Sequence, residues 1–86
     1  MELKKKIDYK KSEYDYIMEQ CSFTDRQKAV IHLLRKGFNI TQISMYTPKE
    51  DDPIEVKNEI PMSESTIKIA KRQILDKIKE LILDMQ

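Results

Sequence analysis

An all-α fold is the prediction from this sequence, and composition, apolar spacing and helix-capping residues support it together. One glycine and three prolines, against 36% charged residues, make a composition typical of helices with charged outer faces. Apolar residues recur every three or four positions in several segments, and residues that cap helices precede those segments. A chain of 86 residues is expected to form one domain, residues 1–86, around a single core.

The first predicted helix is short and covers about residues 13–20, with Ser12 as its N-cap. Such a helix would add an N-terminal element to the main bundle. Four side chains are available for its packing: Tyr14, Ile17, Met18 and Cys21.

A capping box marks the second predicted helix, because Thr24 can accept from the amide of Gln27 while the Gln27 side chain reaches back. Gly37 follows Arg35 and Lys36, which is typical of a helix that ends with cations in its last turn. The apolar positions between these signals have a helical period: Ala29, Val30, Leu33 and Leu34.

The same start signal returns at Asn39 and Gln42, which predicts a third helix that Pro48 ends early. Only Gly37 and Phe38 separate the second helix from this cap, so the two helices must turn sharply against each other. The inward positions would be Ile40, Ile43 and either Met45 or Tyr46.

Residues 47–61 form an acidic insert for which two interpretations are open. The alternation of Ile54, Glu55 and Val56 could form a small hairpin with Glu59 and Ile60, and an ordinary acidic loop is the alternative. Asp51 and Asp52 lack the glycine and terminal glutamate of a calcium loop, which favours a solvated turn. Because the core is assigned elsewhere, residues 49–59 are expected to be dispensable for folding.

The last predicted helix is the longest, since neither glycine nor proline occurs after residue 61, and Ser63 is placed to cap it. Met62 precedes the cap and can pack on Ile67 as a hydrophobic staple. Helical spacing places one apolar stripe on one side, namely Ile67, Ala70, Ile74, Ile78, Leu81 and Met85. The far side carries Ser65, Lys68, Ile69, Arg72 and Asp76.

The far side of this helix suits the major groove of DNA. Lys68 and Arg72 can reach guanine acceptors or phosphates, and Ile69 can touch a thymine methyl group. The free N–H groups at the start of the helix favour a phosphate. Two alternatives stay open: a solvated charged helix face, and packing of Ile69 under the acidic insert.

Two segments resemble the LuxR/GerE-type DNA-binding domain and the related sigma factor region four. The first is Phe23-Thr24-Asp25-Arg26-Gln27, followed by Val30, Ile31, Leu34, Gly37, Ile40 and Ile43. The second is Ser63-Glu64-Ser65-Thr66-Ile67-Lys68, which is similar to the recognition-helix signature and precedes Ile74, Leu75 and Ile78. The resemblance covers residues 22–79 and implies a tri-helical helix-turn-helix. Here the N-terminal helix, the insert at 47–61 and the long C-terminal helix extend that fold.

The resemblance implies sequence-specific binding of double-stranded DNA by a small transcription regulator without enzymatic activity. In that family the positions matching Lys68, Ile69 and Arg72 face the bases or phosphates. The predicted DNA-binding residues are Ser65, Thr66, Lys68, Ile69, Lys71 and Arg72. A sigma-like module that docks on a protein of the transcription machinery, and a structural oligomerisation unit, are the alternative functions. The acidic insert, and a last helix that nothing breaks, depart from the family pattern.

A homodimer is predicted from the end of the apolar stripe, which would otherwise face water. It would present two recognition helices to half-sites about 34 Å apart. The competing arrangement has the helix around Tyr14 and Ile17 folding back over the stripe. The predicted dimer residues are Ile74, Ile78, Leu81, Ile82 and Met85.

Several other classes of protein do not fit the sequence. Cys21 is the only cysteine and His32 the only histidine, so we expect no intramolecular disulfide, no metal site and no cofactor. No apolar run approaches the roughly 20 residues of a membrane span, and no apolar segment follows the basic N-terminus. A cytoplasmic protein without a membrane partner is therefore expected.

Overall fold

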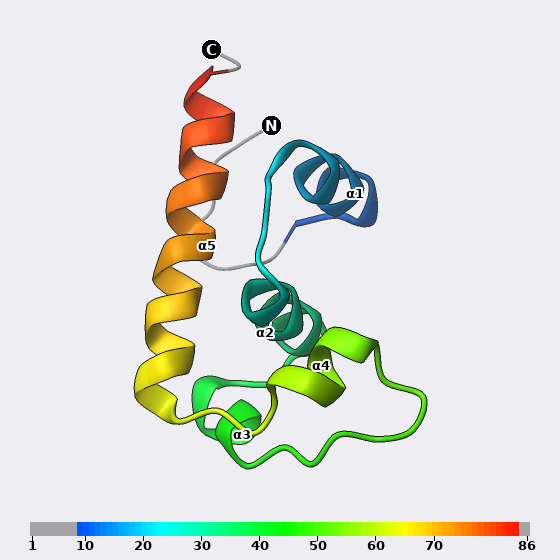
Figure 1. Ribbon diagram of the computed structural model, residues 1–86. Helices are drawn as coiled ribbons and strands as arrows, with labels where there is room; N and C mark the ends of the chain where they lie inside the picture. Colours follow the sequence, from blue (N-terminus) through cyan, green and yellow to red (C-terminus); the bar gives the residue numbers. More distant parts are fainter. Residues whose placement is uncertain (1–8, 85–86) are drawn as a thin grey trace.

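The computed structural model describes residues 9–84, and this part of the chain is all-helical without any strand, which confirms the predicted fold class. Its helices are α1 (Lys11–Gln20), α2 (Asp25–Arg35), α3 (Ile40–Ser44), α4 (Ile54–Glu59) and α5 (Glu64–Asp84). Figure 1 shows α5 standing along one side of the molecule, with α1, α2 and α3 packed against it. The opposite side of α5 carries none of the other described helices.

Local capping bonds fix where α2 and α3 begin, as the sequence predicts. The Gln27 amide donates to Thr24 Oγ1 over 3.2 Å, and the Gln42 amide donates to Asn39 Oδ1 over 2.8 Å. Between the two helices Gly37 has a φ of +93°, a conformation that side-chain-bearing residues rarely adopt. The sharp turn from α2 into α3 is therefore encoded locally.

The start of α5 is capped and tied to α3. Ser63 Oγ accepts from the Thr66 amide over 3.2 Å, which confirms Ser63 as the N-cap. The Thr41 hydroxyl donates to Glu64 Oε1 over 2.6 Å and joins the first turns of the two helices. From Glu64 to Asp84 the helix continues without interruption.

Helix α1 begins earlier than predicted. It starts at Lys11, and the Glu13 carboxylate accepts from the backbone N–H of Lys10 over 2.9 Å. Ser12 therefore lies inside the helix and is not its cap. Tyr14 is buried beneath the guanidinium of Arg35, whose central carbon lies 4.1 Å from the ring centroid, so α1 is also held against the end of α2.

The acidic insert is neither a hairpin nor a plain loop, because residues 54–59 form α4. Val56 is fully buried and Ile60 is 4% exposed, and α4 packs on α2. Residues four apart share one face of a helix, so Val56 and Ile60 enter the core together. The premise that the insert holds no core residue is wrong, so we now expect the insert to be required for folding.

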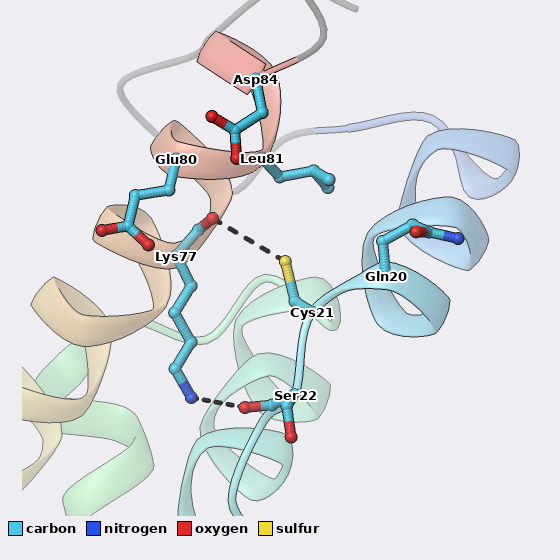
Figure 2. A pocket seen from close by; sticks show the side chains of 7 residues that line it. All are labelled: Gln20, Cys21, Ser22, Lys77, Glu80, Leu81 and Asp84. Carbon is cyan, nitrogen blue, oxygen red and sulfur yellow. Dashed lines mark hydrogen bonds between the residues drawn. The ribbon is translucent and has the colours of Figure 1, made fainter.

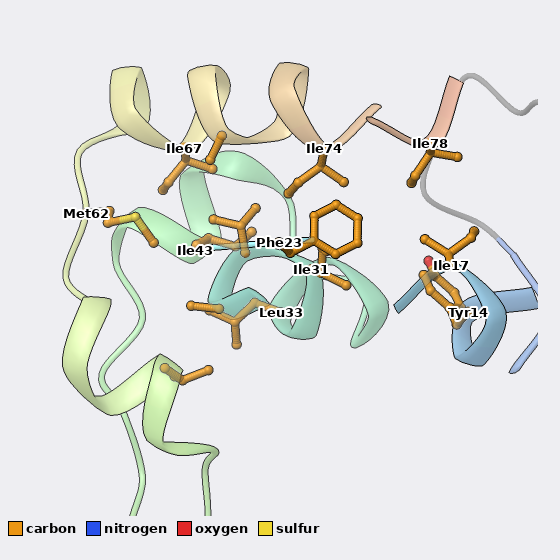
Figure 3. Packing of buried hydrophobic residues seen from close by; sticks show 14 of the residues in the cluster. Tyr14, Ile17, Phe23, Ile31, Leu33, Ile43, Met62, Ile67, Ile74 and Ile78 are labelled. Atoms are coloured by element: carbon orange, nitrogen blue, oxygen red, sulfur yellow. The ribbon is translucent and has the colours of Figure 1, made fainter. Parts of the chain in front are cut away.

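The core runs along the inner side of α5 (Figure 3). Ile67 and Ile74 face the side chains of α2 and α3, and Ile78 lies opposite Ile17 of α1. The buried residues of α5 are Ile67, Ala70, Ile74, Ile78 and Ile82. The stripe thus ends on Ile82, whereas Leu81 is only partly buried and Met85 lies outside the described residues.

The prediction of a dimer interface is wrong for the three isoleucines that it includes. Ile74, Ile78 and Ile82 are each at most 1% exposed within the single chain. Helix α1 packs against α5, and its Ile17 lies opposite Ile78 (Figure 3), which is the kind of contact that the competing arrangement proposed. These side chains are already removed from water and are not available to a second copy.

The rotation of α5 can be tested with one matched pair of substitutions. Ile74→Ala empties a fully buried site and should lower the free energy of unfolding by about 2–5 kcal/mol. Ile69→Ala makes the same change at a 59% exposed position and should alter it by less than about 0.5 kcal/mol. Urea unfolding followed by circular dichroism measures both, and equal losses would contradict the described rotation of α5.

A second matched pair tests the role of the insert. Ile60→Ala should cost about 2–5 kcal/mol of unfolding free energy, because Ile60 belongs to the core. Ile54→Ala, at a position 63% exposed in the same insert, should be almost neutral. Shortening residues 49–59 should abolish cooperative thermal unfolding, and a stable shortened protein would show that α4 is not part of the core.

Candidate nucleic-acid interface

The side of α5 that faces away from the core carries the five residues predicted there, and all five are exposed: Ser65, Lys68, Ile69, Arg72 and Asp76. The first four are here called the outer face, and Asp76 borders it one turn after Arg72. Ile69 is 59% exposed, so packing under the acidic insert does not occur. The four residues lie on one face because the buried stripe of Ile67 and Ile74 fixes the rotation of the helix. An exposed isoleucine framed by two cations is therefore a property of the folded chain.

The outer face is slightly hollowed. A shallow depression, here called the hollow, is lined by Ser65, Lys68, Ile69, Arg72 and Gln73. Its lining combines a hydroxyl, two cations, one apolar side chain and one amide. Such a mixed and open surface suits a large polar partner better than it suits a small molecule, which normally binds in an enclosed pocket.

Lys71 and Thr66, also predicted to bind DNA, lie beside the outer face. Lys71 is partly buried and lines a groove toward α3, together with Phe38, Ile40 and Thr41. Thr66 is partly buried, and its hydroxyl lies 2.9 Å from the hydroxyl of Ser63 in the helix cap. The sequence prediction thus combined outer-face residues with one residue on each flank.

Charge is distributed unevenly along the exposed side of α5. The first half exposes two cations, Lys68 and Arg72, and one acid, Glu64, whereas the second half exposes three acids, Asp76, Glu80 and Asp84, and one cation, Lys79. The N-terminal end of a helix also carries the positive end of its dipole. The first half of α5 therefore attracts a polyanion more strongly than the second half does.

Gln73 is the residue of this surface that the sequence prediction missed. It is exposed and lines the hollow, and its Oε1 accepts from the Nε2 of Gln27 in α2 over 3.0 Å. Its position four residues after Ile69 places it near that side chain on the helix, which is a signal that sequence alone contains. The bond to Gln27 depends on the tertiary structure and has no local signal.

Lys77 ties α5 to the segment between α1 and α2 (Figure 2). Its ammonium donates to the carbonyl of Ser22 over 2.6 Å, and its own carbonyl accepts from the Cys21 thiol over 3.8 Å. Burial raises the pKa of the Cys21 thiol above its ordinary value, so this thiol stays protonated. Cys21 acts as a packing residue here, and the described residues contain no cluster of three metal-ligating side chains.

A polar cluster holds the acidic insert against α2. The side chain of Asp52 is only 2% exposed, and its Oδ2 accepts from the Tyr46 hydroxyl and from the Lys49 amide, both over 2.7 Å. Lys36 Nζ lies 3.6 Å from Oδ1. The bond from the Lys49 amide, with that from Tyr46, holds the pKa of Asp52 below its ordinary value. The solvated turn expected at Asp51 and Asp52 is therefore wrong for Asp52.

His32 borders the same cluster. Its Nε2 lies 3.9 Å from Asp52 Oδ1 and makes no hydrogen bond within the described chain. Desolvation, together with the nearby Lys36 ammonium, lowers the pKa of His32 below its ordinary value. The imidazole is therefore neutral at pH 7.

The cluster keeps the insert away from the outer face. Among the described elements, α4 packs on α2 and makes no close contact with α5 (Figure 1). All five acidic residues between α3 and α5 lie in the insert, so its position on α2 keeps them away from Lys68 and Arg72. The acidic insert therefore does not block a polyanion at the outer face.

The role of Asp52 predicts a specific dependence on pH. A carboxyl group with a lowered pKa in the folded state stabilises the fold above its unfolded pKa, and this contribution is lost as the pH falls through the folded value. Asp52→Asn should therefore lower the unfolding free energy at pH 7, and the difference from wild type should shrink below about pH 4. Thermal unfolding between pH 2.5 and pH 7 measures this. Asp51→Asn, at the exposed neighbouring residue, is the control and should follow wild type throughout.

Comparison with known proteins gives no family for this chain: no protein-family model, no curated protein and no solved structure matches it. The resemblance to the LuxR/GerE-type domain therefore stays a prediction from the sequence. Within residues 9–84 no helix combines the length and apolar character that crossing a membrane requires.

Proposed function

We propose that this protein binds duplex DNA in a sequence-specific manner through the outer face of α5 and acts as a small helix-turn-helix transcription regulator. The observation that carries the proposal is the exposed Ile69 between Lys68 and Arg72, on a helix side that no other described helix covers. Burying an apolar side chain is favourable, so an isoleucine left open beside two cations is suited to a partner that is both anionic and partly apolar.

The dimensions of α5 fit this partner. A helix with its side chains is about 10–12 Å wide, and the major groove of B-DNA is about 12 Å wide. Because α1, α2 and α3 all lie on one side of α5, its other side can enter a groove without a clash from them. The Thr41 bond to Glu64 holds α3 beside the entering end.

Each outer-face side chain has a chemical role in such a complex. Lys68 and Arg72 are donors for guanine O6 and N7 or for phosphate oxygens. Ile69 can contact the methyl group of thymine, and the Ser65 hydroxyl can donate or accept. The face contains no set of side chains that would catalyse a reaction on the bound DNA, so the proposed role is binding.

Salt-dependent affinity tests the proposal. Arg72→Ala and Lys68→Ala should each weaken binding to a selected duplex by about 1–3 kcal/mol if the side chain contacts a base, or reduce the salt slope if it contacts a phosphate. Fluorescence anisotropy of a labelled duplex at several salt concentrations distinguishes the two cases.

Lys79→Ala is the matched control, because Lys79 is an exposed cation in the second half of the same helix. It should change the affinity far less than either outer-face substitution. Both outer-face variants should keep the wild-type melting temperature, since neither side chain is buried. Wild-type affinity in the double variant Lys68→Ala, Arg72→Ala would refute the assignment of the outer face.

A further inference from the structure

A chain of hydrogen bonds fixes which atom of Gln27 is its oxygen. Gln27 is only 5% exposed, and its Oε1 accepts from the Thr24 amide over 3.1 Å and from Lys77 Nζ over 2.7 Å. A backbone N–H and an ammonium group can only donate, so the atom that faces them must be the carbonyl oxygen. The amino group of Gln27 then has to face the other way, toward α5.

The same reasoning fixes the orientation of the Gln73 amide. The Gln27 Nε2 donates to Gln73 Oε1 over 3.0 Å, and an amide nitrogen has no acceptor function. The carbonyl oxygen of Gln73 must therefore face Gln27, and its amino group is directed away from it. Because Gln27 is buried, its bonds are protected from water and hold this orientation more firmly than an exposed contact would.

The amino group of Gln73, turned away from Gln27, is the group that this residue can offer to a partner at the hollow. Gln73 is exposed and lines the hollow together with Ser65, Ile69 and Arg72. An isolated glutamine can rotate its amide and present either the oxygen or the nitrogen to a base. Here one of these two choices is removed by Gln27.

We infer that Gln73 is a specificity-determining residue that offers the major groove a hydrogen-bond donor, and that Gln27 is the positioning residue that sets this polarity. The inference rests on the proposed DNA-binding function. A glutamine reads adenine by donating to N7 and accepting from the N6 amino group, which needs its oxygen at the base edge. With its oxygen held by Gln27, Gln73 favours guanine, which presents two acceptors, and disfavours cytosine, which presents a donor.

Selection of bound sequences from random duplexes tests this assignment in wild type and in three single variants. Wild type should enrich a motif with guanine preferred over cytosine at one position by about tenfold. Gln73→Ala should lose the preference at that position and keep the rest of the motif. Gln73→Glu presents only acceptors, so it should reverse the preference toward cytosine while weakening binding to every duplex.

Gln27→Glu tests the positioning role separately. Its carboxylate can still accept from Thr24 and Lys77, but toward Gln73 it can only accept, so the Gln73 amide should turn over, donate to the carboxylate and present its oxygen at the outer face. The preference at the same position should shift from guanine to a base that donates, adenine or cytosine, and the melting temperature should stay near that of wild type. A purely structural role for Gln27 would change the melting temperature and leave the base preference unaltered. If Gln27→Glu does not fold, the two Gln73 variants still decide the assignment.

The possible failures are distinguishable. If wild type enriches a motif that both Gln73 variants reproduce unchanged, the inference is wrong and the proposed function stands. If wild type enriches no motif and shows no salt-sensitive binding to duplex DNA, the proposed function fails and the inference falls with it. Lys79→Ala serves again as the control and should reproduce the wild-type motif.

Discussion

The isoleucine stripe of α5 is too long for any one neighbouring helix to cover, and the arrangement of the other helices follows from that constraint. Helices α2 and α3 bury its first half at Ile67 and Ile74, and α1 packs on its second half, where Ile17 lies opposite Ile78. Burying one such side chain contributes about 1.5–3 kcal/mol, so the stripe is a large share of the stability of so small a domain. Because a single chain already buries all of these isoleucines, none of them is left exposed for a dimer contact.

The candidate interface is a geometric consequence of that buried stripe. Once Ile67 and Ile74 point inward, the period of 3.6 residues places Lys68, Ile69 and Arg72 outward. The side chains that stabilise the fold and those proposed to contact DNA therefore lie on opposite sides of one helix, so a change in one set need not disturb the other. The same rotation brings Gln73 to the edge of the outer face, where α2 can reach it.

Two buried polar side chains, Gln27 of α2 and Asp52 of the insert, connect α2 to two different elements. Buried polar groups are costly unless they are hydrogen-bonded, and Gln27 Oε1 and Asp52 Oδ2 each accept two hydrogen bonds. Asp52 holds the insert on α2, away from the outer face, whereas Gln27 joins α2 to α5. Both interactions connect residues of separate elements, so they fix the relative positions of those elements as well as stabilising them.

The sequence by itself determined the features whose causes are local. Capping bonds span three residues, so the starts of α2, α3 and α5 at Thr24, Asn39 and Ser63 could be predicted, and the exposed Lys68, Ile69 and Arg72 followed from helical spacing. Only the tertiary structure decided that residues 54–59 form a helix, because six residues are too few for a clear period and it is packing on α2 that buries Val56. It also decided that Ile17 of α1 faces Ile78 and that Gln27 faces Gln73, since these contacts join residues more than 40 positions apart, whose proximity no local pattern encodes.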